Sequence, residues 1–410
     1  MGALDHIRIC DFGGQLAGAG ATKLLAAFGA EVIRVEDPTT QGRWDMMRVV
    51  GPYVDERRGV DLGGGFNNHN VNKLGVTINL RAPEGPALLE KLLAVCDVVT
   101  ENFAAGVLDR LGFGYEALAA IKPDIIYVSN CGFGHTGPHR SFKTWGPVVQ
   151  AVSGLTFNNG LPDEEPAGWG FSYMDHGAAG FMAIAILAAL HHREVTGEGQ
   201  WVDLASTTAG ITMQRTAVLD WTVNGRPSRR PGQPNGNHAD FDAMAPHNIY
   251  AALGDDRWVA LACRDDDDWR ALCDLVDDDD ARAGRFSGLA GRLEHQDQLD
   301  EIIGRWVGGR EAGAAASELV AAGVPASVVK SPRERIDEDP DLDAWGLFPS
   351  VDHPLMGEVR VEGVPLHFSE TDWSIDKAAP LLGEDNDRIF RELLDLDGAE
   401  LERLRSEGVV

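Results

Sequence analysis

Short apolar stretches alternate with amphipathic helical patterns through the first two hundred residues of the chain. Each stretch has the length of a buried strand, and the intervals are long enough for helices. Strands joined by helical crossovers pair in parallel, so the alternation predicts an α/β fold built on a parallel sheet. The expected strands are Ile7–Phe12, Glu31–Val35, Gly75–Asn79, Val98–Glu101 and Ile125–Ser129. The expected helices between them are Ala19–Phe28, Pro83–Val95 and Tyr115–Ile121.

The pattern changes in the second half of the chain. Two long helices are expected at His176–His192 and Leu204–Thr222, and a stretch rich in Gly, Pro, Asn and Asp follows at residues 224–242. The remaining expected elements are two short strands within residues 247–263, helices to about Ala322, strand-like segments at 323–329 and 357–368, and a closing helix at Asn386–Leu394.

The charge of the chain excludes one large class of ligands. Its net charge is -28, from 36 basic and 64 acidic residues. Nucleic-acid binding needs a basic face, so a nucleic-acid partner is not expected. An anionic ligand must instead find a local basic pocket.

Cysteine and histidine spacing predicts no metal site. The five cysteines form neither a CxxC pair nor a zinc spacing, and the twelve histidines include no HExxH pair.

Strand-like "IRICDF" begins after six residues, without a signal peptide before it. The longest apolar run, Phe181–Leu190, is about half of a bilayer span, so we expect a cytoplasmic protein without a membrane contact.

A dinucleotide-binding turn is a first alternative for the N-terminal region. "GGQLAGAGAT" follows the first strand and opens a helix, which would present backbone N–H groups to a phosphate. Its glycine spacing is not GxGxxG. The segment Gly132–Gly137 does match GxGxxG, but it runs into Pro138 rather than into a helix. A nicotinamide cofactor is therefore not favoured.

Asp175 is the candidate for chemistry. It precedes the long apolar helix in "FSYMDHGAAGF", beside small residues that leave its approach open. One interpretation is a helix N-cap, in which the carboxylate accepts hydrogen bonds from the first N–H groups. The other is a nucleophile, kept ionised by the helix N-terminus and able to attack an activated acyl group. The residues alone leave both open.

Several segments together resemble the class III coenzyme A transferases, the family of formyl-CoA and carnitine CoA-transferases. The resemblance covers nearly the whole chain. It rests on "IRICDFGGQLAGAGATKLLAAFGAEVIRVEDP", "NKLGVTINL", "ENFAAGVLDRLGFGYEAL", "IYVSNCGFGHTGPH", "MDHGAAGFMAIAILAALHHREVTGEGQWVDLA" and "PLLGEDNDRIFRELL".

The resemblance implies an acyl-CoA:carboxylic acid CoA-transferase that acts through a covalent aspartyl-CoA thioester on Asp175. Coenzyme A enters as a thioester substrate, and no tightly bound cofactor is implied. The implied coenzyme A contacts are Ala17, Lys73, Asn102, Phe103, Arg110 and Lys143. Arg34, Lys73, Arg110 and Lys143 are the cations that this acidic chain could offer an anionic ligand.

The resemblance also implies a fold and an assembly. The fold is a large Rossmann-like domain made from both chain ends, residues 1–222 and 331–410, with a linker and smaller α+β domain inserted at 223–330. The assembly is an interlocked homodimer, with linkers at Asn224–Asn237 and around Ser331–Pro340.

Aromatic residues suggest an apolar or aromatic acyl group. Trp145, Phe157, Trp169, Phe171 and Tyr173 are expected near the site, although packing in a core explains them equally well. Gly134 and its loop are candidates for backbone donors to an oxyanion.

Two further functions remain as alternatives. The similar α-methylacyl-CoA racemases use a histidine base, and the corresponding position here is Trp145, whose indole has no basic nitrogen. A catalytically silent acyl-CoA-binding homologue is the other alternative.

Overall fold

The computed structural model describes residues 2–160, 164–170, 172–229, 237–239 and 243–410. The chain divides into two compact units. The first, called here the sheet unit, comprises Met1–Thr156, Gly168–Arg215 and Asp341–Val410. The second unit comprises Phe157–Ala167 and Thr216–Pro340. The domain boundaries implied by the resemblance stay a prediction.

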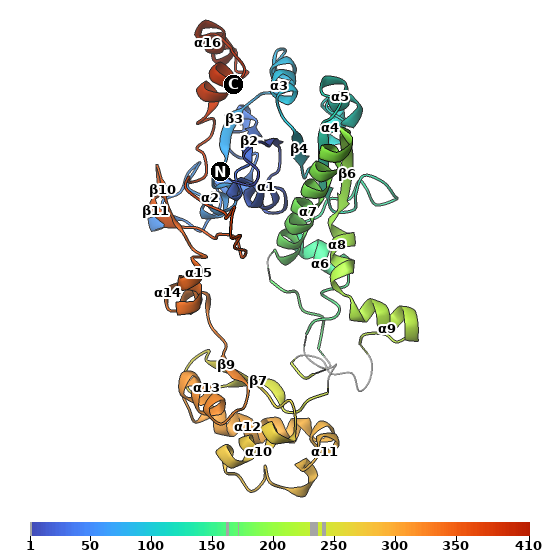
Figure 1. The fold of residues 1–410 in the computed structure, drawn as a ribbon, viewed down its shortest axis with the longest axis vertical. Helices are drawn as coiled ribbons and strands as arrows, with labels where there is room; N and C mark the ends of the chain where they lie inside the picture. The colour runs from blue at the N-terminus through green and yellow to red at the C-terminus, as the bar shows by residue number, and fades with distance from the viewer. Residues whose placement is uncertain (1, 161–163, 171, 230–236, 240–242) are drawn as a thin grey trace. The chain divides into compact units, whose positions relative to one another are not determined.

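The sheet unit is built on a six-stranded parallel sheet (Figure 1). The strand order is β3-β2-β1-β4-β5-β6, so the order reverses between β1 and β4. The strands are β1 (Arg8–Asp11), β2 (Glu31–Glu36), β3 (Leu74–Thr77), β4 (Val98–Glu101), β5 (Ile126–Cys131) and β6 (Gln200–Ala205). The α/β class and the five strands predicted from the sequence are confirmed, with ends that differ by one or two residues.

Helices cover both faces of this sheet because successive strand residues point to opposite sides. α1 (Ala17–Ala27) and α7 (Tyr173–Thr196) lie side by side against one face, where Ile9 is buried (Figure 1). Cys10 is buried on the other face. That face is covered by α3 (Gly85–Ala94), α4 (Val107–Arg110), α5 (Tyr115–Ile121), the π-helix η5 (Arg388–Leu393) and α16 (Gly398–Ser406).

Two predicted helices are wrong in part. The range Leu204–Thr222 contains the end of β6, then α8 (Ser206–Met213) and the larger part of α9 (Thr216–Asn224). The predicted closing helix at Asn386–Leu394 is the short η5, and α16 follows it as the last helix.

Shorter elements complete the sheet unit. They are η1 (Pro38–Thr40), η2 (Met46–Arg48), η3 (Val54–Glu56), α2 (Gly64–Asn70), α6 (Gly146–Val152), α15 (Pro340–Trp345), and the antiparallel pair β10 (Ser350–His353) and β11 (Gly357–Arg360).

The second unit has its own core around an antiparallel sheet. Its strands are β7 (His247–Ala251), β8 (Trp258–Ala262) and β9 (Ala326–Val328). Its helices are α9, α10 (Asp266–Val276), α11 (Leu289–Glu294), α12 (Gln296–Gly308), α13 (Ala312–Ala321) and α14 (Pro332–Asp337), with a short helical turn η4 (Gly284–Phe286).

α7 is longer at both ends than the helix predicted at His176–His192. By length and composition alone its 24 residues could cross a membrane, and it is the one helix in the described part of the chain that could. One side of α7 is buried in the sheet unit through Ala178, Met182 and Ile186. A helix that packs one side into the core of an α/β sheet needs no membrane to explain its apolar residues.

Candidate active site

A cavity of about 650 Å³ lies at the carboxyl ends of the central strands. Loops that follow β1, β4 and β5 form its walls, and the strand order reverses between β1 and β4. Open parallel sheets bind ligands at this kind of position, because the two loops leave in opposite directions. The cavity is lined by Gln15, Leu16, Ala17, Met46, Met47, Val50, Asn102, Phe103, Ala104, Cys131, Gly132, Phe142, Lys143, Thr144, Trp145, Gly146, Pro147 and Asp175.

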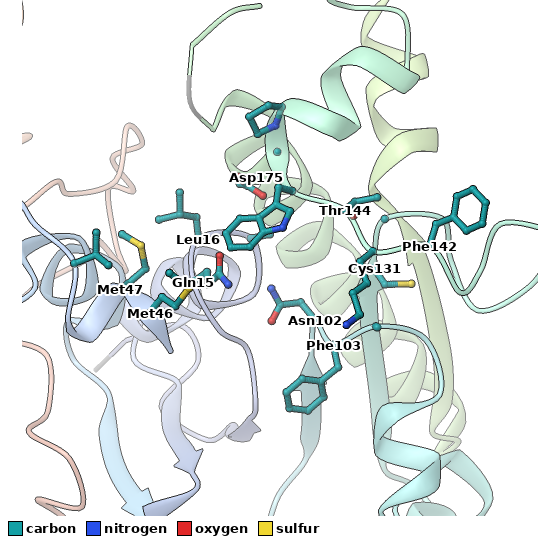
Figure 2. A pocket seen from close by; sticks show the side chains of 18 residues that line it. Gln15, Leu16, Met46, Met47, Asn102, Phe103, Cys131, Phe142, Thr144 and Asp175 are labelled. Atoms are coloured by element: carbon teal, nitrogen blue, oxygen red, sulfur yellow. The ribbon is translucent and has the colours of Figure 1, made fainter. Parts of the chain in front are cut away.

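Asp175 lines this cavity from the first turn of α7 (Figure 2). The interpretation of Asp175 as the N-cap is wrong. Ser172 is the N-cap residue, and Asp175 lies three residues into the helix. Among the described residues none donates a hydrogen bond to its carboxylate, which is therefore not engaged in holding the helix end.

Burial changes the acidity of Asp175. Loss of solvent raises the pKa of its carboxyl group from 3.8 to about 6. The helix N-terminus was expected to hold the group ionised, but desolvation has the larger effect. At neutral pH the group is still mostly a carboxylate, more basic than an exposed aspartate. A poorly solvated carboxylate without donors is a stronger nucleophile than a hydrogen-bonded one.

Asn102 joins the two loops on either side of the reversal in strand order. Its Oδ1 accepts the N–H of Gly14 at 2.7 Å, and its Nδ2 donates to the carbonyl of Gly14 at 3.0 Å. Gly18 makes this approach possible, since a Cβ there would lie 2.7 Å from Asn102 Oδ1. The first turn of α1 and the end of β4 are thereby fixed side by side.

Four of the predicted coenzyme A contacts lie together around the cavity. Ala17, Asn102, Phe103 and Lys143 line it with Asp175. The Phe103 ring packs against Trp44, with centroids 5.5 Å apart, and its N–H donates to Glu101 at 2.5 Å. Lys143 lies in the loop after β5 and is exposed.

Three predicted contacts lie outside the cavity lining. Arg34 is fully buried and pairs with Asp45 at 2.6 Å. Lys73 is also fully buried, donates to Asp11 at 3.1 Å, and has its pKa lowered to about 8 by desolvation. Arg110 lies in α4 and does not line the cavity. Arg34 and Lys73 are thus enclosed in this arrangement and cannot touch a ligand in the cavity.

A network of buried ion pairs around Arg34 was not predicted from the sequence. Asp45 accepts from Arg34 and also from the N–H of Gln15, at 3.0 Å. Arg48 binds Glu36 at 2.5 Å and also pairs with Asp61. Gln15 and the neighbours of Asp45, Met46 and Met47, line the cavity. This network therefore holds two walls of the cavity to β2.

The predicted substrate-pocket residues separate into two groups. Trp145 lines the cavity. Trp169 and Tyr173 pack edge to face with centroids 6.0 Å apart and do not line it. Gly134 turns the chain behind Cys131 with a φ of 74° and does not line it either. Phe157 belongs to the second unit, and Phe171 lies outside the described residues.

Most other lining residues lie in loops, where periodic patterns give no signal. Figure 2 shows Leu16, Met46 and Met47 on one side of the cavity and Thr144 and Phe142 on the other. Cys131 also lines the wall, with a thiol. Desolvation raises the pKa of this thiol to about 11, so it is protonated at neutral pH.

Comparison with known proteins gives a consistent family. A family model described as CoA-transferase family III matches residues 4–386. The succinyl-CoA–D-citramalate CoA-transferase of Chloroflexus aurantiacus is 33% identical over 99% of this chain and 98% of its own. The succinyl-CoA:mesaconate CoA-transferase of Haloarcula marismortui is 31% identical over 100% of both chains. The crystal structure of a CAIB/BAIF family protein from Brucella suis superposes with a TM-score of 0.86 at 28% identity, covering 96% of this chain and 99% of that one.

Proposed function

This chain belongs to CoA-transferase family III, and on that premise we propose that it passes coenzyme A from an acyl-CoA to a free carboxylic acid through a covalent bond to Asp175. The observation that carries the proposal is the Asp175 carboxylate itself. It lines the cavity without a hydrogen-bond donor among the described residues, and burial raises its pKa to about 6.

The proposed reaction conserves the thioester energy at every step. A carboxylate oxygen of Asp175 attacks the thioester carbonyl, the C–S bond breaks, and a mixed anhydride and coenzyme A thiolate form. The thiolate attacks the Asp175 side of the anhydride and releases the donor acid as a carboxylate. The resulting aspartyl-CoA thioester then reacts with the acceptor carboxylate by the same two steps in reverse. No net proton is consumed, because each thiolate or carboxylate that leaves is matched by one that attacks.

The cavity residues divide the binding task. Ala17, Asn102 and Phe103 are proposed to contact coenzyme A, and Lys143 to supply a cation for its phosphates. Arg110 lies outside the cavity lining, so we propose for it only a contact with a part of coenzyme A that extends beyond the cavity. We assign Arg34 and Lys73 a supporting role, because both are enclosed by carboxylates of the sheet unit. Gly134 is not adjacent to the cavity, so we do not place the oxyanion donors there.

The wall near Asp175 favours an apolar acyl group. Leu16, Met46, Met47 and Trp145 line the cavity there, and methionine side chains adapt to varied shapes. The named relatives act on succinyl-CoA with D-citramalate or mesaconate. A screen of acyl-CoA donors against carboxylic acids identifies the pair that this chain uses.

Trapping of the intermediate tests the covalent mechanism. With a donor acyl-CoA and no acceptor, hydroxylamine should convert the aspartyl-CoA thioester to a hydroxamate that peptide mapping places on Asp175. Asp175→Ala and Asp175→Asn should abolish both labelling and turnover but retain coenzyme A binding. Glu194→Gln is the matched control, since Glu194 is an exposed acid at the far end of the same helix.

Two results would contradict the proposal. One is wild-type turnover by Asp175→Asn without deamidation to aspartate. The other is rapid exchange of deuterium into the α-carbon of a 2-methylacyl-CoA without an acceptor acid. Exchange of that kind would show that the protein removes an α-proton, as a racemase does, although Trp145 stands where the racemases have their histidine base.

We further propose that the chain works as an interlocked homodimer. Apolar side chains stand exposed on both units: Ile184 on α7 is 64% exposed, and Trp221 on α9 is 61% exposed. Monomers rarely leave so many large apolar groups in water unless another chain covers them.

A further inference from the structure

Three side chains of types that commonly bind transition metals in proteins lie close together near the carboxyl end of β5. Cys131 ends β5, His135 lies in the loop that follows, and Asp203 lies on β6. One ligand atom from each lies within 4.8 Å of the other two. Among the described residues, this is the one group of three or more His, Cys, Asp or Glu side chains that meets this condition.

The register of the sheet brings the ligands to one face. Asp203 is paired with Ser129 in the parallel ladder, and Ser129 is paired with Glu101 on the other side. Registered residues of parallel strands point to the same face, and so does Cys131, two residues beyond Ser129. The turn at Gly134 then folds His135 back over this row, where the His135 N–H donates to Asp203 at 2.9 Å.

The distances suit a tetrahedral ion. Cys131 Sγ lies 3.8 Å from His135 Nδ1, and His135 Nδ1 lies 3.2 Å from Asp203 Oδ1. Metal–ligand bonds of about 2.0–2.3 Å at tetrahedral angles separate neighbouring ligand atoms by about 3.3–3.7 Å. These two distances match that range to within a few tenths of an ångström, and the third pair, the Cys131 sulfur and the Asp203 carboxylate oxygen, lies within 4.8 Å.

A buried carboxylate stands behind the histidine. The Nε2 atom of His135 lies 3.6 Å from Oε1 of Glu101, whose side chain is almost fully buried. Glu101 is itself fixed by the Tyr127 hydroxyl at 3.0 Å. Metal-binding histidines commonly donate their second ring N–H to a carboxylate, which orients the ring and selects the tautomer. In this structure Nδ1 contacts Asp203 at 3.2 Å and the Ser129 hydroxyl at 3.3 Å, so Nδ1 becomes the ligand atom when the ring proton is on Nε2, on the side of Glu101.

We propose that Cys131, His135 and Asp203 form a binding site for a thiophilic divalent cation, of which Zn²⁺ fits best. A sulfur, an imidazole nitrogen and one carboxylate oxygen favour Zn²⁺ over Mg²⁺ or Ca²⁺, which prefer oxygen ligands. On binding, the Cys131 thiol loses its proton to solvent, and the His135 ring carries its one proton on Nε2, facing Glu101. A water molecule fills the fourth position. Asp175 takes no part in the site.

This site could not be predicted from residue spacing, because its three ligands are not close together in the chain. Asp203 lies 68 residues beyond His135. The three ligands come together only because β5 and β6 are neighbours in the sheet.

Metal uptake by the full chain tests the proposal. The protein, freed of any affinity tag and treated with a chelator, is dialysed against Zn²⁺ and its metal content measured by mass spectrometry. We expect one Zn²⁺ per chain. Co²⁺ in place of Zn²⁺ should give tetrahedral d–d bands and a near-ultraviolet thiolate-to-cobalt band, which report the Cys131 bond directly.

Variants assign the ligands. Cys131→Ser, His135→Gln and Asp203→Asn should each lower Zn²⁺ affinity at least tenfold, and Glu101→Gln should lower it about 10- to 100-fold through the histidine. Cys273→Ser is the matched control, because Cys273 is a buried cysteine of the second unit and its variant should keep wild-type affinity. Circular dichroism checks that each variant is folded.

Three results would overturn the site. They are no stoichiometric Zn²⁺ uptake by the wild type, a Co²⁺ spectrum without a thiolate band, and unchanged affinity in folded Cys131→Ser and Asp203→Asn. The spectrum of the wild type decides the question even if a variant fails to fold.

Discussion

Burial of Asp175 ties its reactivity to pH. Desolvation raises the pKa of the carboxyl group to about 6, and attack on a thioester requires the ionised form. An aspartate with an ordinary pKa near 4 would stay ionised throughout the range in which most enzymes are assayed. With a pKa of about 6, the carboxylate of Asp175 becomes protonated, and so loses its nucleophilic form, within that range.

We therefore expect the rate of Asp175 labelling to fall on the acid side. The proton-free fraction decreases about tenfold per pH unit below the pKa, so the rate should be level above pH 7 and fall steeply below about pH 6. Single-turnover labelling from pH 5 to 8, with coenzyme A binding measured in parallel, checks this. A rate that is level from pH 5 to 7 would show that the ionisation of Asp175 does not control the step.

The sequence predicted the position of the candidate carboxylate better than its surroundings. Asp175 was singled out by its place before an apolar helix and by the resemblance, and it does line the cavity. Arg34 and Lys73 lie outside the cavity lining, and the sequence could not show this because it gives the charge of a residue but not its partners. Asp45 is 11 residues from Arg34, and Asp11 is 62 residues from Lys73. Only the folded chain shows that these carboxylates bind both cations in the interior.

Among the elements, β2 and the segment after it anchor one wall of the cavity, the wall that carries Met46 and Met47. Glu36 at the end of β2 binds Arg48, and Arg34 within β2 binds Asp45. Met46 and Met47 lie between Asp45 and Arg48 in the chain, so both ends of this short piece are held by buried ion pairs. The position of Met46 and Met47 in the cavity wall therefore depends on these two buried ion pairs.

Removal of Arg48 should destabilise the sheet unit strongly. Arg48→Ala leaves Glu36 buried without its main partner, and loss of one member of a buried pair costs about 3–5 kcal/mol. The free energy of unfolding, measured with urea, should fall by about that amount, and coenzyme A binding should weaken with it. The exposed Arg58 serves as control, and Arg58→Ala should change stability by less than about 0.5 kcal/mol. An equal effect of the two substitutions would show that the network does not hold the wall.

The strand that the sequence analysis missed shows the limit of periodicity. β6 is an edge strand with one neighbour, and its residues are half-buried or, at Trp201 and Asp203, exposed. Its six residues run directly into α8, and the predicted helix began at Leu204, within the end of the strand. Short edge strands carry the weakest signal, because one face of the pattern is open to solvent. The central strands, buried on both faces, were predicted almost to the residue.

For the molecule as a whole, the strand order explains why the candidate site lies where it does. The alternation of strands and helices predicted a parallel sheet, and a parallel sheet has a binding edge at its carboxyl ends. The order itself could not be read from the pattern, since β4 follows β3 in the chain yet pairs with β1. The reversal between β1 and β4 opens the space in which Asn102, Ala17 and Asp175 meet.

The exposed apolar helices motivate the last prediction. α9 has no buried residue, and its Leu219, Trp221 and Val223 are more than half exposed. Ile184 on α7 is exposed to the same extent. If a partner chain covers these side chains, a charge placed among them is buried without a partner. Trp221→Asp should then lower the melting temperature by several degrees, whereas the same substitution in a monomer would make an exposed surface more soluble at little cost.

Interlocking makes a sharper prediction than association alone. Chains that thread through one another cannot separate while folded, so dimer and fold should be lost in one transition. Sedimentation at decreasing concentrations should show a dimer down to the detection limit, and urea should convert it directly to unfolded monomer, with a midpoint that rises with protein concentration. A reversible dimer held only by apolar faces would instead give folded monomers on dilution. Folded, stable monomers at low concentration would therefore rule out interlocking, and Trp221→Asp would then report an ordinary interface.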